Sequence, residues 1–239
     1  MSLRQLGRLA LVSRSFLQRS RYNQFKTLEI GDSDKVSTLF PLVRSPLATF
    51  KPHVTKIVLR GLSIFPENEF MAFFAALPNV QSVALAGYAN IPNVDYLPKI
   101  LQQIECLENL ELSIFRVSSF TILSKIICAS SKPETLQLNY VIFPIDAIFQ
   151  SDSELLQGIQ PPPANLRTLK IGDSYLSGYD ILYRWLNSGS KSLKLSTIHL
   201  LSCYTNYPQS TAALLQSLGP SLEHLCVETT HSPFSVHGG

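Results

Sequence analysis

A seven-residue motif that occurs twice is the feature that most constrains this chain. Residues 27–33 read TLEIGDS, and residues 168–174 read TLKIGDS. Similar short patterns of the form LxxLxL recur between and around the two copies at nearly constant intervals. Such a regular period predicts a repeat protein, here with about eight units. The central apolar residues of these units are Leu28, Ile57, Val83, Leu110, Leu136, Leu169, Ile198 and Leu225.

Each unit is expected to supply one short strand, followed by a helix in most units. The segments between the strands carry apolar residues three and four positions apart, as one buried helical stripe requires. Pro98 is expected to loosen the second helix, Trp185 is expected in the core, and the prolines at 161–163 predict an irregular connection. The predicted helices are 66–77, 93–107, 118–129, 146–159, 179–186 and 209–218.

The period of the pattern and its LxxLxL core resemble the leucine-rich-repeat family. The resemblance implies an α/β fold, a solenoid with parallel strands on its concave face and helices on its convex face. The family usually places Asn or Cys three residues after the last strand leucine. Only Cys203 matches here, so a less regular arc is expected. The other residues at this position are Leu62, Tyr88, Phe115, Val141, Ser174 and Thr230.

The N-terminal stretch carries a second pattern, in which Leu6, Leu9, Val12 and Phe16 recur at helical spacing before the first strand. This stretch resembles the second half of an F-box, with residues 6–16 matching its central motif. A segment like the first F-box helix, with its LPxE-like motif, is not found. The chain is thus similar to divergent fungal-type F-box/leucine-rich-repeat proteins. The resemblance implies that Leu9, Val12 and Phe16 contact a Skp-type adaptor.

Two other interpretations of this N-terminal stretch remain open. An apolar helical stripe before stacked repeats can be an end cap that covers the first unit. Five arginines, several serines and no acidic residue in the first 28 positions also fit an organelle transit peptide. At the other end, the strand centred on Leu225 is predicted to have an uncovered edge that favours aggregation.

The expected domain organisation is a helical F-box-like segment or cap at 1–25, a repeat domain at 26–230 and a tail at 231–239. An F-box followed by leucine-rich repeats implies a substrate-recognition subunit of an SCF-type cullin-RING ubiquitin ligase. The alternative is a leucine-rich-repeat scaffold or regulator with no ubiquitin ligase link. Either role makes the chain a protein-binding module and not an enzyme.

The concave face is the expected binding surface for a client protein. Alternate strand residues point away from the core, and the middle units have the densest set of hydrogen-bonding side chains. Aromatic residues just after the strands, at 88, 115, 140, 175 and 204, are either partner anchors or core residues. The predicted client-binding residues are Asn109, Glu111, Gln137, Asn139, Lys170 and His199.

Several functional classes lack support in the sequence. No GxSxG, HExxH or glycine-rich phosphate-binding motif occurs, so no catalytic residue and no cofactor site is predicted. The four cysteines form no CxxC pair, and His199 and His224 have no obvious third ligand, so no metal is predicted. The GDS residues of the repeated motif are expected to be turn formers.

Charge and hydropathy narrow the choice of partners. The net charge is +3, but six basic residues precede the first acidic residue, leaving 14 basic and 17 acidic residues in the remainder. The repeat region therefore lacks the excess of basic residues that nucleic-acid binding requires. No apolar run approaches the roughly 20 residues needed to span a bilayer. Cysteine usage and the lack of a signal peptide favour an intracellular location, cytoplasmic or nuclear.

Overall fold

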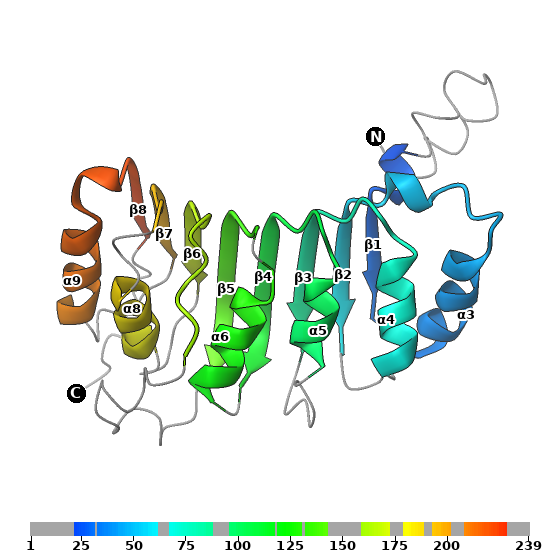
Figure 1. Cartoon of the computed structure of the whole chain (residues 1–239), viewed down its shortest axis with the longest axis horizontal. Helices are drawn as coiled ribbons and strands as arrows, with labels where there is room; N and C mark the ends of the chain where they lie inside the picture. Colours follow the sequence, from blue (N-terminus) through cyan, green and yellow to red (C-terminus); the bar gives the residue numbers. More distant parts are fainter. Residues whose placement is uncertain are drawn as a thin grey trace, which may run out of the picture.

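The computed structural model describes residues 22–31, 33–61, 67–87, 96–117, 119–130, 132–142, 159–172, 179–188, 193–201 and 208–228. Within these ranges the chain is a mixed α/β protein with a single eight-stranded sheet (Figure 1). All neighbouring strands are parallel, and their order in the sheet follows their order in the sequence. The strands are β1 (Thr27–Ile30), β2 (Lys56–Arg60), β3 (Ser82–Ala86), β4 (Asn109–Arg116), β5 (Thr135–Ile142), β6 (Thr168–Gly172), β7 (Thr197–Leu201) and β8 (His224–Glu228).

The register of the sheet confirms the eight strand positions predicted from the sequence. The eight central apolar residues, from Leu28 in β1 to Leu225 in β8, are direct partners along one row. Even the weakest copy of the pattern, around Leu136, forms a strand of full length. A nearly constant period therefore places equivalent residues of successive units side by side.

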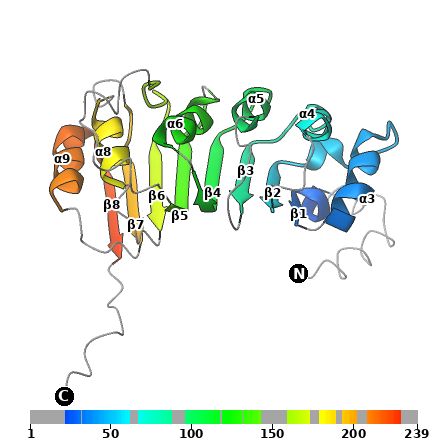
Figure 2. The ribbon, with the colours of Figure 1, turned by 90° about the horizontal axis from the view of Figure 1, so that it is seen from below.

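Within the described residues, helices cover one side of the sheet only. Figure 2 shows them in a row along that side, with the strands along the other. The side without helices is called the open face below. The helices are α3 (Ser33–Arg44), α4 (Glu67–Ala75), α5 (Leu97–Gln102), α6 (Phe120–Cys128), α8 (Tyr179–Ser188) and α9 (Pro208–Leu218).

Four of the predicted helices, now α4, α6, α8 and α9, are confirmed to within about two residues at each end. The helix predicted at 93–107 is wrong in extent, because α5 covers only Leu97–Gln102 in its described part. Pro98 lies in the first turn of α5, where a missing N–H costs nothing, so it starts the helix and does not loosen it. The helix predicted at 146–159 lies outside the described residues except for Ile159. Helix α3, which contains Pro41, was not predicted.

The apolar faces of strands and helices form one continuous core from Leu28 to Leu218. Trp185 is 1% exposed, which confirms its predicted place in the core. Its Nε1–H donates to the carbonyl oxygen of Gln160 at 2.7 Å, and its ring meets Phe120 edge-on at 5.6 Å. The prolines at 161–163 form no helix or strand, as predicted. The Trp185 hydrogen bond therefore fixes this irregular connection to the core.

Strands β4 and β5 are longer than the others and share a backbone feature that the sequence did not reveal. Ile114 has φ 52° and Tyr140 has φ 57°, both in the left-handed region that side chains disfavour. Pairing resumes beyond them, with Phe115 opposite Val141.

Phe115 and Val141 are buried, whereas Tyr140 is 41% exposed. Of the aromatic residues predicted after the strands, Phe115 therefore belongs to the core and Tyr140 to the surface. The other three lie outside the described residues.

None of the helices in the described part of the chain is long and apolar enough to cross a membrane.

Candidate functional site

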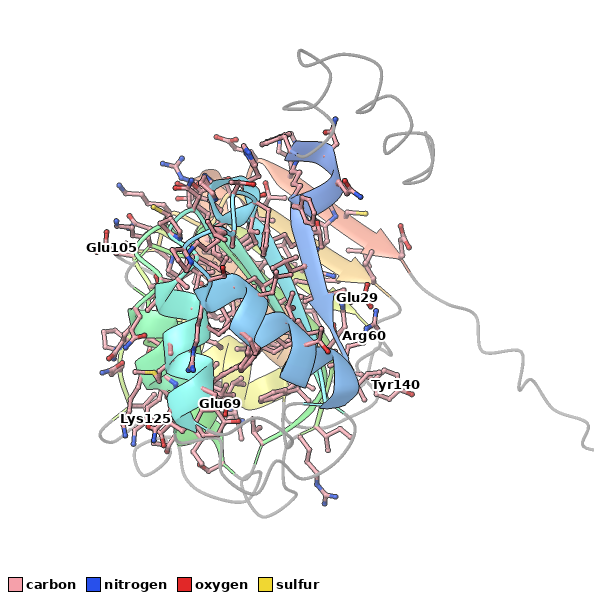
Figure 3. All side chains as sticks on the ribbon, turned by 90° about the vertical axis from the view of Figure 1, so that its right-hand side faces the viewer. Glu29, Arg60, Glu69, Glu105, Lys125 and Tyr140 are labelled. Atoms are coloured by element: carbon pink, nitrogen blue, oxygen red, sulfur yellow. The ribbon has the colours of Figure 1, made fainter. Side chains whose placement is uncertain are left out.

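The open face consists of three rows of side chains that run across the strands. Figure 3 shows Glu29, Arg60 and Tyr140 on this side of the sheet, and Glu105 and Lys125 on the helical side. The rows follow from the parallel register, because equivalent positions of neighbouring strands lie about 4.8 Å apart. The middle row is Glu29, Val58, Ala84, Glu111, Gln137, Lys170, His199 and Cys226.

The six predicted client-binding residues lie together on strands β4 to β7, and all six are partly exposed. Four of them are consecutive members of the middle row: Glu111, Gln137, Lys170 and His199. Asn109 belongs to the row on one side and Asn139 to the row on the other. We call these six residues the central polar patch.

A chain of hydrogen bonds orders two residues of the central polar patch. Asn139 Nδ2 donates to Ser113 Oγ at 3.3 Å, and Ser113 Oγ donates to Glu111 Oε1 at 2.9 Å. Gly172 makes room for this arrangement, because a Cβ atom there would lie 2.6 Å from Asn139 Oδ1. Glu111 is thereby held in place by residues of its own strand and of β5.

Ser113 and Gly172 were not among the predicted site residues. The repeat pattern predicts both at outward-facing strand positions, and the structure confirms their place on the open face. The close approach of the Asn139 side chain to Gly172 could not be predicted, because it depends on a side-chain conformation. Gly172 also belongs to the second copy of the seven-residue motif.

The other four residues of the patch are not hydrogen-bonded to one another. Within the described part of the chain, the side chains of Asn109, Gln137, Lys170 and His199 make no hydrogen bond or ion pair. Glu111 and Lys170 lie two strands apart, about 10 Å between their backbones in the plane of the sheet, and they form no ion pair with each other. The patch thus presents a negative and a positive group to solvent at a fixed separation.

The open face over β1 to β3 is different. Glu29 and Arg60 satisfy each other in an ion pair of 2.7 Å, with both side chains more than half exposed. Beyond them, Val58 and Ala84 are apolar, and Ala84 is only 5% exposed. In the middle row, the polar side chains without a partner in the described part of the chain therefore lie over β5 to β7, at Gln137, Lys170 and His199.

The predicted adaptor-binding residues Leu9, Val12 and Phe16 lie outside the described residues. The described chain begins with a helical stretch at 22–25 that leads directly into β1. The Phe25 ring at its end stacks on Phe50 with centroids 5.0 Å apart. This helical stretch is thus anchored to the first unit by an aromatic contact.

In the described ranges, no group of three His, Cys, Asp or Glu residues could hold a metal ion. His199 is opposite Cys226 while His224 is opposite Thr197, so the two histidines are diagonal neighbours. Burial raises the pKa of the Cys128 thiol to about 11, and its Sγ donates to Pro161 O at 3.3 Å. Cys128 is therefore protonated at neutral pH and a poor nucleophile.

A pocket of about 350 Å³ lies on the helical side, between α5 and α6. Its described lining has Lys125 as the only ionisable side chain, beside two glutamines, a proline and an isoleucine. A lone ammonium group on the surface provides no acid–base pair. The arrangement over β4 to β7 is the stronger candidate for a functional site.

No family model matches this chain, and no curated protein matches it either.

Proposed function

We propose that this chain is a leucine-rich-repeat solenoid and a protein-recognition module, whose central polar patch binds an extended segment of a client protein. One observation carries the proposal: Glu111, Gln137, Lys170 and His199 are consecutive in one row on the open face, which no described helix covers. Three of these four side chains make no hydrogen bond within the described chain. Such a row offers polar contacts at regular intervals to a chain that crosses the strands.

The charges of the patch suggest which segments would bind. An acidic side chain fits over Lys170, and a basic or hydrogen-donating side chain fits over Glu111. Their separation of about 10 Å corresponds to roughly three residues of a polyproline II segment, in which every third side chain points the same way. We therefore expect client segments with an acidic residue and a basic residue three positions apart.

Peptide selection tests this expectation. The purified chain is used to select from a random peptide library, and the selected peptides are titrated by fluorescence anisotropy. Lys170→Glu should weaken binding about tenfold or more, as expected when like charges are placed in contact. Lys125→Glu is the matched control, because Lys125 is an exposed lysine on the helical side (Figure 3). Equal effects of the two substitutions would contradict the proposed binding face.

We further propose that the module is the substrate-recognition subunit of an SCF-type cullin-RING ubiquitin ligase, located inside the cell and without catalytic activity of its own. The support is the F-box-like pattern of residues 6–16 and its close connection to β1 through residues 22–25. In this arrangement Leu9, Val12 and Phe16 bind a Skp-type adaptor while the central polar patch holds the client.

A pull-down with a purified Skp-type adaptor tests the ligase link. The chain should retain the adaptor, and Leu9→Arg, Val12→Arg or Phe16→Arg should abolish retention. Leu42→Arg is the control, because Leu42 on α3 is already 50% exposed. Failure of the unsubstituted chain to retain the adaptor would remove the ligase assignment. Peptide binding that persists in that case would instead assign a scaffold or regulator.

A further inference from the structure

The C-terminal edge of the sheet has apolar side chains that no other described element covers. Leu225 is 48% and Val227 is 52% exposed, whereas the equivalent residues of β7, Ile198 and Leu200, are 1% and 5% exposed. Within the described residues, β8 pairs only with β7. A strand edge of this kind is a template for pairing with another chain.

Among the described residues, the N-terminal end of the sheet offers no complementary surface. In β1 the equivalent residues Leu28 and Ile30 are 9% and 0% exposed. If β8 of one copy were to add to β1 of another, Leu225 and Val227 would meet a strand whose apolar groups are already covered. Such head-to-tail contacts would also continue without closing.

The backbone of β8 shows which groups face its free edge. His224 N donates to Ser196 O at 2.9 Å, so His224 and the residues alternating with it, Cys226 and Glu228, direct their N–H and C=O groups toward β7. In an interior strand the alternate residues direct their N–H and C=O groups toward the next strand. Gly61, directly after β2, shows this, because its N–H donates to Ala86 O of β3 at 3.0 Å. The N–H and C=O groups of Leu225 and Val227 therefore face the free edge.

We propose that β8 pairs antiparallel with β8 of a second copy of this chain, about a two-fold axis at Cys226. Leu225 of each copy is opposite Val227 of the other and exchanges two backbone hydrogen bonds with it. His224 is opposite Glu228 of the second copy, and this pairing occurs twice. Cys226 is opposite its own counterpart in a non-hydrogen-bonded pair, where Cα atoms lie about 4.5 Å apart.

The side chains of β8 favour this register over the symmetric registers shifted by one residue. Symmetric pairing centred on Leu225 or Val227 also satisfies the backbone, but it pairs fewer of the five strand residues and separates His224 from Glu228. Centring on Cys226 places apolar side chains together on the helical side and complementary polar side chains together on the open face. The closed dimer would have both central polar patches on the same side of one sixteen-stranded sheet.

Dimer formation can be measured by sedimentation velocity of the full chain over a range of concentrations. The contact of one strand is smaller than a standard interface of about 800 Å² per partner, so a dissociation constant in the micromolar range is expected. Leu225→Lys should weaken the dimer at least tenfold by this measurement. Leu42→Lys is the matched control, because Leu42 is 50% exposed on α3, and it should leave the dimer unchanged. Val227→Pro removes an N–H that faces the free edge and should also abolish the dimer.

The register is tested by mild oxidation with copper phenanthroline, followed by mass-spectrometric mapping of the disulfide. The product should link Cys226 to Cys226 of the second copy, and Cys226→Ser should abolish the link while leaving the non-covalent dimer. Cys106 is an internal control, because it is exposed but lies far from β8 in the sheet order.

Four results would overturn the proposal. The first two are a chain that stays monomeric at every concentration and an assembly that continues beyond the dimer. The third is disulfide formation at Cys106 as readily as at Cys226. The fourth is a chain that dimerises only after residues 229–239 are deleted. The last result would show that the C-terminal residues of the same chain occupy the edge.

Discussion

Strands β7 and β8 have the same length and the same alternation of apolar residues, yet they differ sharply in burial. Ile198 and Leu200 are almost fully buried in β7, while Leu225 and Val227 are about half exposed in β8. Both strands pair in register with the strand before them. The difference is that β7 has a following unit and β8 has none within the described residues. The apolar pattern thus specifies the strand, but burial requires the next unit.

The N-terminal end shows another way to close such a sheet. Strand β1 has no described strand on its outer side, yet Leu28 and Ile30 are buried. Helix α3 follows β1, and its Phe40 stacks on Phe73 of α4 with centroids 4.8 Å apart. Phe25 stacks on Phe50 beside it. Helices and aromatic contacts here replace a neighbouring strand.

The largest loss of stability is expected from Leu110→Ala in the interior strand β4. Leu110 is 2% exposed, and its loss leaves a cavity between stacked units. The free energy of unfolding should fall by about 2 to 5 kcal/mol, measured by urea denaturation. Glu111→Ala is the control on the opposite face of the same strand and should cost much less. The reverse order would show that the two faces are wrongly assigned.

A smaller loss is expected from Trp185→Phe. The substitution removes the Nε1–H that donates to Gln160 O and leaves that carbonyl without this donor. Together with the lost ring volume, the change should cost about 1 to 3 kcal/mol in urea denaturation. The control Phe120→Leu disturbs the same aromatic contact but keeps the hydrogen bond. If Trp185→Phe proves neutral, the irregular connection does not depend on this bond.

The third prediction concerns how the ionisation of Cys128 makes the free energy of unfolding depend on pH. Burial raises the pKa of this thiol from 9.0 to about 11 in the folded state. Between pH 9 and pH 11 the Cys128 thiol therefore stays protonated in the folded chain but is ionised in the unfolded chain. The free energy of unfolding should be unaffected by this thiol below pH 9 and should decline as the pH rises toward 11. Urea denaturation across this range should show a shallower decline for Cys128→Ala. Parallel curves for the two proteins would contradict the assignment.

The smallest effect is expected from Leu225→Ala at the exposed end. A half-exposed side chain has less burial to lose, so the cost should be about 1 kcal/mol or less. The measurement is made in dilute solution, where the chain is monomeric. A cost equal to that of Leu110→Ala would mean that another part of the chain covers β8.

The repeat pattern was sufficient to predict the strands because its signal is local and recurs. Alternating apolar residues at a nearly constant period determine both the eight strands and their register, and hence the common face of Glu111, Gln137, Lys170 and His199. The N-terminal assignments at Leu9, Val12 and Phe16 remain predictions.

What the sequence could not reveal depends on tertiary context. Pro41 inside α3 interrupts the helical signal, and the helix is stabilised by packing against α4. Ile114 is β-branched and intrinsically avoids the left-handed conformation that it adopts, so no local rule predicts it. The hydrogen bonds from Asn139 to Ser113 and from Ser113 to Glu111 depend on side-chain conformations fixed only in the assembled sheet.

The sequential strand order has a mechanical consequence. Because every described strand pairs only with its described predecessor and successor, tension applied through the two termini can detach the outermost strand without disturbing the others. The molecule would then lengthen in a series of similar steps rather than in one rupture, and each step would release one repeat. At about 3.5 Å per residue, one repeat corresponds to roughly 9 nm of contour length, so optical tweezers would resolve the extension as a staircase.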